Sequence, residues 1–228
     1  MKRTTMTMAL MLGLALAAPY AGAAGRAKAH GAKENADGGA TAGSATAYSG
    51  PNGAKGVRGH AVSTDGAGNA KIVSGSAGKG PSGGSYGRAG ATTVGNGTLS
   101  HKSGGFVQGA NGGYASRKGS TVANSDSSVQ HSAAASGSGP DGSFNTAGSF
   151  NRNPDGTYSG RRSTTATGAN GTYSGNTQYA NGSGSHTTDY AAKNGDTYTG
   201  DTSWTKGEGV THSGTCRDAS GNVISCSH

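Results

Sequence analysis

Large aliphatic and aromatic side chains are scarce in this sequence of 228 residues once the first 23 are set aside. Residues 24–228 hold one Leu, two Ile, nine Val and three Phe, or 15 of 205 positions. A chain in which Leu, Ile, Val and Phe fall below roughly 20% is not expected to form a conventional core. The composition therefore excludes an ordinary single-core enzyme domain of this length.

The N-terminus is the exception to this scarcity. Lys2 and Arg3 precede an apolar run of 13 residues over 6–18, and the small-residue triplet Ala-Gly-Ala over 21–23 follows. This order is typical of a secretory signal peptide, with cleavage expected near Ala23. The run is shorter than the roughly 18 residues of a spanning helix. We therefore predict a signal peptide over 1–23, a secreted, periplasmic or cell-surface chain, and no transmembrane segment after cleavage.

Charge is unevenly distributed along the chain. Residues 26–118 contain 11 Lys and Arg against three acidic residues, a net charge of +8. Residues 119–228 contain six basic and eight acidic residues, a net charge of −2. A basic first half is suited to an anionic surface polymer or glycan. The competing interpretation is that scattered Lys and Arg only keep the chain soluble, and no specific nucleic-acid partner is expected.

Cysteine is also scarce, since only Cys216 and Cys226 are present. An even count in an exported chain indicates a disulfide. The turn-forming run Ala-Ser-Gly-Asn lies between them over 219–222, and folding back around Gly221 places position 216 opposite 226. We predict a disulfide-stapled hairpin here, because two cysteines alone are half of a zinc ligand set.

Catalytic and cofactor motifs are absent or accidental. Residues 80–84 spell a nucleophile elbow but lack its flanking apolar strand and helix. Residues 137–142 spell a dinucleotide fingerprint, yet no buried strand precedes it and Pro140 interrupts it. The seven histidines stand singly along the chain. We therefore predict no catalytic, cofactor-binding or metal-binding residues, and a protein that is not an enzyme.

The few bulky residues fall at regular intervals, one after each turn-forming pair, at steps of 12 to 15 residues. These repeat anchors are Val57, Ile72, Tyr86, Leu99, Tyr114, Val129, Phe144, Tyr158, Tyr173, Tyr198, Val210 and Val223, and His186 holds the corresponding place between Tyr173 and Tyr198.

Turn chemistry explains the spacing of these anchors. Asn-Gly and Asp-Gly pairs tolerate positive φ and favour tight chain reversals, while the Thr, Ser, Tyr and Val between them suit extended backbone. Each unit is thus predicted to be a turn followed by one strand. The expected fold is mainly β, either a repetitive antiparallel meander or a small β-solenoid, with helix only in the signal peptide. If Asn181-Gly182 is a two-residue hairpin loop, Tyr173 lies opposite Tyr190.

Composition divides the mature chain into three parts. Residues 24–48 lack both turns and bulky anchors and are expected to form a disordered arm. Residues 49–142 carry weak, glycine-rich, basic repeats. Residues 143–228 form a Tyr- and Thr-rich β-repeat region that ends in the disulfide hairpin.

Three predicted turns contain proline followed by Asn-Gly or Asp-Gly, and they are Gly-Pro-Asn-Gly over 50–53, Gly-Pro-Asp-Gly over 139–142 and Asn-Pro-Asp-Gly over 153–156. They resemble the turns of uncharacterised bacterial exported proteins rich in Gly, Asn, Ser and Thr. This resemblance implies no activity. Residues 195–200 are similar to the opening of a MORN repeat, but Trp204 comes two residues too late, so the MORN function is not transferred.

These features predict an exported structural or interaction protein of the cell surface or extracellular matrix. Its expected partners are further copies of itself, or an anionic surface polymer or glycan. The alternatives are a glycan- or ice-binding β-repeat module and a largely disordered secreted chain.

Overall fold

The computed structural model describes residues 24–226, which fall into two compact units, 24–112 and 113–226. The expected signal peptide over 1–23, including its helix, lies outside the described residues. The compositional boundary expected at residue 142 falls within the second unit.

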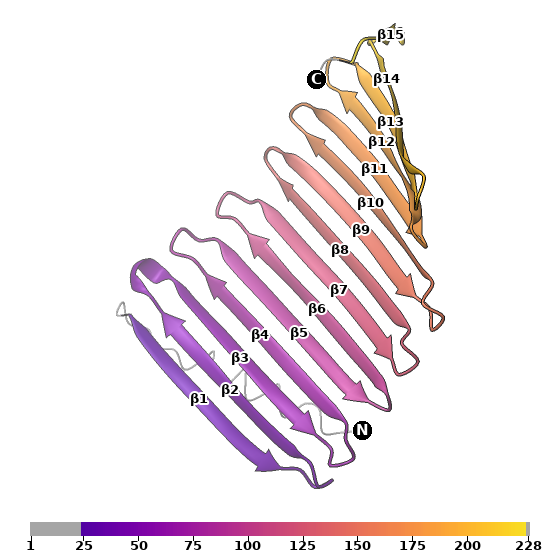
Figure 1. The fold of residues 1–228 in the computed structure, drawn as a ribbon. Coiled ribbons are helices and arrows are strands. Elements are labelled where there is room, and N and C mark those ends of the chain that lie inside the picture. The colour runs from indigo at the N-terminus through magenta and orange to yellow at the C-terminus, as the bar shows by residue number, and fades with distance from the viewer. Residues whose placement is uncertain (1–23, 227–228) are drawn as a thin grey trace. The chain divides into compact units, whose positions relative to one another are not determined.

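The first unit is an antiparallel meander in which each strand pairs with the next one in the chain (Figure 1). Its strands are β1 (Gly25–Glu34), β2 (Ala40–Ser49), β3 (Lys55–Thr64), β4 (Ala70–Lys79), β5 (Ser85–Gly95) and β6 (Thr98–Gln108). A single 3-10 turn over Pro51–Gly53 joins β2 to β3.

The second unit has the same architecture with more strands. Its strands are β7 (Tyr114–Asn124), β8 (Val129–Gly139), β9 (Gly142–Arg152), β10 (Tyr158–Gly168), β11 (Gly171–Ala180), β12 (Ser183–Ala192), β13 (Thr197–Thr205), β14 (Gly209–Arg217) and β15 (Val223–Ile224). The mainly β fold and the antiparallel meander are thus confirmed.

The turns reverse the chain as their residues predict. Asn181 and Gly182 have φ values of 49° and 92° and form a two-residue loop between Ala180 and Ser183. Positive φ at both centres matches the right-handed twist of the flanking strands. The register that follows places Tyr173 opposite Tyr190, which confirms the predicted cross-strand pair.

Longer turns rely on side chains of Asp and Asn. In the turn between β9 and β10, the backbone N–H of Asn153 donates to the Thr157 carbonyl at 2.8 Å. The Asp155 carboxylate accepts from the backbone N–H of Thr157 at 2.9 Å. These local hydrogen bonds satisfy backbone groups that would otherwise continue the ladder, so β9 ends at this turn.

The expected disordered arm over 24–48 is wrong, because β1 and nearly all of β2 occupy it. Ten residues of β1 pair in register with ten of β2. The turn that reverses the chain is a glycine turn, with Gly38 at a φ of 78° and the Asn35 amide bonded to the Gly39 carbonyl at 2.7 Å. Sequence pattern missed these strands because their Ala, Gly and Ser side chains carry little strand signal.

Each unit is a single layer, so a conventional core is missing. Among the described residues, the buried apolar side chains are Ala47 and Ala61, at 4% and 6% exposure, and both lie in the first unit. The strands contact chiefly their neighbours in the chain. Backbone ladders and cross-strand side-chain pairs, rather than a buried interior, are therefore the main stabilising interactions.

The repeat anchors lie within the first three residues of their strands, one on each of β3 to β11 and β13 to β15. They do not share one face. Val57 lies on the opposite face of the first unit from Ile72, Tyr86 and Leu99, because successive strand residues alternate between faces. The anchors therefore mark where strands begin, and they do not form one interior.

Candidate interaction surfaces

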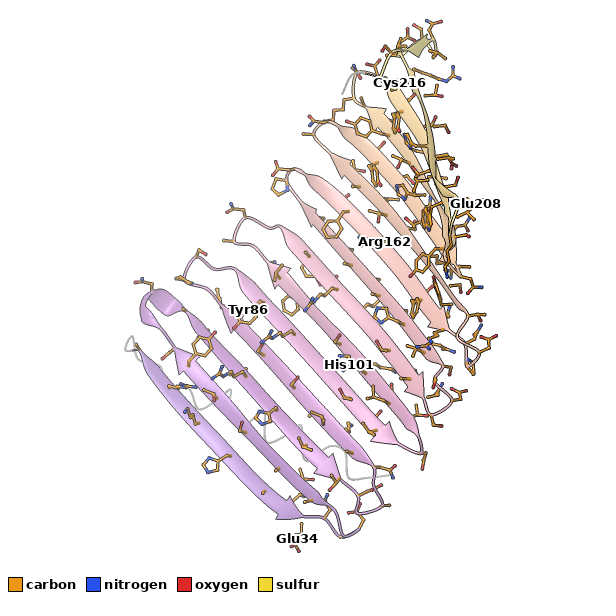
Figure 2. All side chains as sticks on the ribbon, viewed as in Figure 1. Glu34, Tyr86, His101, Arg162, Glu208 and Cys216 are labelled. Atoms are coloured by element: carbon orange, nitrogen blue, oxygen red, sulfur yellow. A yellow bond between two sulfur atoms is a disulfide. The ribbon has the colours of Figure 1, made fainter. Side chains whose placement is uncertain are left out.

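The first unit carries two tyrosines that lie flat on one face of the sheet, which we call the tyrosine face. The register of β1 to β6 aligns Arg26, Tyr48, Gly56, Gly78, Tyr86 and Val107 in one row across it. The hydroxyl oxygens of Tyr48 and Tyr86 are hydrogen-bonded at 2.8 Å over the two strands between them. Figure 2 labels Tyr86 in this row.

The glycines of this row make room for the rings. A Cβ at Gly78 would lie 2.8 Å from Cε1 of Tyr86, and one at Gly56 would lie 2.6 Å from Cζ of Tyr48. Each ring therefore covers bare backbone with one side and leaves the other to solvent. Tyr48 is 37% exposed. The hydrogen bond to Tyr86 and partial burial raise the pKa of Tyr48 above its ordinary value.

A row of cations lies beside these rings on the same face. The register places Lys28, Thr46, Arg58, Ser76, Arg88 and Gly105 side by side on successive strands. Lys28, Arg58 and Arg88 are exposed and occupy every second strand. The Arg88 Nε donates to the Ser76 hydroxyl at 2.9 Å, which orients its guanidinium along the row.

The second unit carries a larger set of rings on one face, which we call the aromatic face. Pairing across β8 to β14 brings eight aromatic side chains to it, and these are Phe144, Phe150, Tyr158, Tyr173, Tyr179, Tyr190, Tyr198 and Trp204. The other face of these strands holds chiefly Ser, Thr, Asn and Ala. The rings are half-buried or exposed, since only the sheet itself covers them.

Glycines again lie beneath the rings. A Cβ at Gly160 would collide with the Tyr179 ring, and one at Gly184 would lie 2.8 Å from Cε2 of Trp204. In both cases the ring and the glycine are direct cross-strand partners. Packing an aromatic ring over a strand glycine compensates for the missing side chain. Part of the high glycine content therefore makes room for aromatic rings on the sheet.

Both ring-bearing faces also carry paired hydroxyl and imidazole groups. Four histidines pair across strands with a threonine whose hydroxyl lies 2.8 Å from Nδ1. Thr92–His101 lies on the tyrosine face of the first unit, and the aromatic face holds the pairs Thr121–His131, Thr177–His186 and Thr202–His212. These histidines stand singly in the sequence, and their pairing was not predicted. The signal that could have identified it is a Thr at the paired position of the neighbouring strand.

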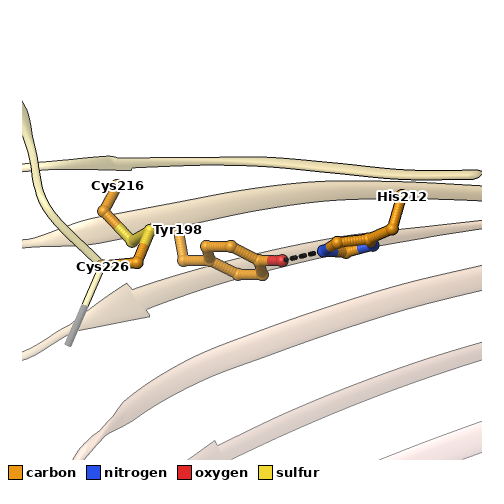
Figure 3. The surroundings of a disulfide bond; sticks show 4 residues. All are labelled: Tyr198, His212, Cys216 and Cys226. Atoms are coloured by element: carbon orange, nitrogen blue, oxygen red, sulfur yellow. Dashed lines mark hydrogen bonds between the residues drawn. A yellow bond between two sulfur atoms is a disulfide. The ribbon is translucent and has the colours of Figure 1, made fainter. Parts of the chain in front are cut away.

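The predicted disulfide is present between Cys216 and Cys226, with Cα atoms 5.4 Å apart. The strand partner of Cys216 is Ile224 rather than position 226, so the predicted register is two residues off. The observed register is set by the turn over 218–222, in which the backbone N–H of Asp218 donates to the Asn222 carbonyl. Figure 3 shows the disulfide next to Tyr198, whose hydroxyl lies 3.3 Å from Nε2 of His212.

No protein-family model, curated protein or solved structure matches this chain. Within residues 24–226, no helix is long and apolar enough to cross a membrane. In that same part of the chain, His, Cys, Asp and Glu do not gather in groups of three that could hold a metal ion. The two ring-bearing faces are therefore the most distinctive chemical features that the described residues offer.

Proposed function

We propose that this chain is an exported, non-enzymatic interaction protein of the cell surface or extracellular matrix, which holds extended glycan chains on its flat sheet faces. The observation that carries this proposal is the set of rings on the aromatic face, each backed by the sheet and open to solvent on its outer side. The apolar C–H side of a pyranose ring stacks on such an aromatic surface.

The layout of the rings suits a polymer better than a compact ligand. Phe150, Tyr179 and Trp204 lie in one row on alternate strands, with Gly160 and Gly184 between them. Alternate strands are about 9.6 Å apart, a spacing close to two pyranose rings joined in an extended chain. The threonines on this face offer hydroxyls to the sugar hydroxyls.

Export is supported by the N-terminal pattern around Ala23 and by the disulfide, since disulfides persist mainly outside the cytoplasm. Edge-to-edge assembly is a competing structural role. Four of the ten residues of the edge strand β1, namely Arg26, Lys28, Lys33 and Glu34, are charged, and charged edges oppose strand addition. Binding along the faces is therefore favoured over fibre formation.

The test is a binding panel on the purified protein, with insoluble and soluble glycans, analysed by pull-down and affinity electrophoresis. Replacing Tyr179 by Ala removes one ring, and covering about 50 Å² of apolar surface is worth about 1 kcal/mol, or roughly 5-fold in affinity. Tyr114→Ala, on the other face of the same unit, is the matched control. Binding to no glycan, or equal loss in both variants, contradicts the proposal.

Export is tested separately. Fractionation of the producing cell and mass spectrometry of the mature N-terminus are expected to find the protein outside the cytoplasm, beginning near residue 24. A cytoplasmic protein that retains residues 1–23 contradicts this part of the proposal.

A further inference from the structure

From the tyrosine face we infer that the first unit binds an acidic linear polysaccharide, laid across the strands along the cation row. This inference rests on the proposed function and names the ligand class of one surface. The cations Lys28, Arg58 and Arg88 and the rings of Tyr48 and Tyr86 supply the contacts, in two adjacent parallel rows of one face.

The acidic side chains of this unit are confined to one end of its strands, which also holds Lys33 and Lys71. Six cations lie at the end bounded by the turns over 50–54 and 80–84, and they are Arg26, Lys28, Lys55, Arg58, Lys79 and Arg88. Among residues 24–112 the acidic side chains are Glu34, Asp37 and Asp65, all at the opposite end of the strands. Glu34 is six residues from Lys28, or about 20 Å along the strand. The cations therefore have no carboxylate in their rows, and an anionic ligand would supply the missing countercharge.

The cation spacing favours one class of anion. Lys28, Arg58 and Arg88 stand on alternate strands, so their Cα atoms are about 9.6 Å apart. A polysaccharide with one carboxylate per disaccharide presents charges at about this interval. Each strand of duplex nucleic acid carries a charge every ~3.4 Å, so most of its phosphates would find no cation in this row.

The neighbouring groups suit sugar rings. Tyr48 and Tyr86 lie over glycines with their outer sides open, and their joined hydroxyls make a continuous surface across β2 to β5. Thr46 and Ser76 lie between the cations and offer hydroxyls to the sugar.

The experiment compares hyaluronan, which has one carboxylate per disaccharide, with neutral dextran and duplex DNA, by affinity electrophoresis and calorimetry of the purified protein at low and moderate salt. Hyaluronan is expected to bind, more weakly as salt rises. Arg58→Gln and Arg88→Gln are each expected to weaken it about 5-fold, as for the loss of one exposed charge contact. Lys71→Gln, on the opposite face of β4, is the matched control and should change hyaluronan affinity less than 2-fold.

The outcomes separate this inference from the proposed function. Equal binding of dextran and hyaluronan, or equal losses in Lys71→Gln and Arg58→Gln, overturns the acidic-polysaccharide site but leaves a glycan-binding protein. Tighter binding of duplex DNA than of hyaluronan on this row also overturns it. If every glycan fails to bind, the proposed function fails with it. Circular dichroism of each variant confirms that the sheet is retained.

Discussion

Tyr48 and Tyr86 join their hydroxyls at 2.8 Å above Gly56 and Gly78, which belong to the two strands that separate them. The two tyrosines are 38 positions apart in the sequence. Each ring rests on a glycine of the adjacent strand. This arrangement makes the glycines of the row structural partners of the rings, and it gives the first testable consequence.

Gly56→Ala is expected to lower the free energy of unfolding by about 1 to 3 kcal/mol, because its methyl group would occupy the space of the Tyr48 ring. Gly31→Ala is the matched control, since a Cβ there meets nothing within 4 Å. Because glycine in a strand costs conformational entropy on folding, Gly31→Ala should leave the free energy of unfolding unchanged or raise it by about 0.5 to 1 kcal/mol. Thermal and urea unfolding measure both. Equal effects in the two variants would show that the rings do not need bare backbone.

The cross-strand pair of Tyr173 and Tyr190 should be energetically coupled. A double-mutant cycle with Tyr173→Ala and Tyr190→Ala is expected to give a coupling of about 0.5 to 1 kcal/mol. Tyr173 and Tyr198 lie in the same row but two strands apart, so their cycle serves as the control, with coupling under about 0.5 kcal/mol. Similar couplings in the two cycles would contradict direct cross-strand contact.

Reducing the Cys216–Cys226 disulfide should destabilise the C-terminal end of the second unit alone. Closing a loop of this length contributes about 2 to 3 kcal/mol. Hydrogen exchange is expected to quicken in β14 and β15 on reduction, while β1 to β6 stay protected. A Cys216→Ser, Cys226→Ser double variant should show the same pattern without reductant. Global unfolding on reduction would mean that the disulfide supports more than the terminal hairpin.

Acid should loosen four turns first. Hydrogen bonds from turn residues lower the pKa of Asp65, Asp126, Asp155 and Asp218 below the ordinary value of 3.8. Because each pKa is lower in the folded state, the stabilisation is present above pH 3.8 and is lost as the pH falls through the folded-state pKa. NMR or hydrogen exchange between pH 5 and pH 2 should show the turns loosening. Asp155→Asn, which keeps an acceptor for the turn, should remove that turn's acid response.

The sequence determined the local geometry of this protein. Turn pairs such as Asn181-Gly182 set the ends of strands and the register between neighbours, because positive φ at both centres admits few residues. Given that register, the opposition of Tyr173 and Tyr190 and the pairing of Cys216 with Cys226 could be predicted from a short stretch of chain. The bulky anchors marked strand starts for the same reason.

Only the tertiary structure decided which residues share a face beyond adjacent strands. The row that joins Lys28, Arg58 and Arg88 depends on the summed registers of β1 to β5, and a one-residue slip in any hairpin would move a cation to the other side. The formation of β1 and β2 also depends on tertiary structure. Their small side chains give little strand preference, and the two segments are held by backbone hydrogen bonds that form only when the neighbouring strand is present.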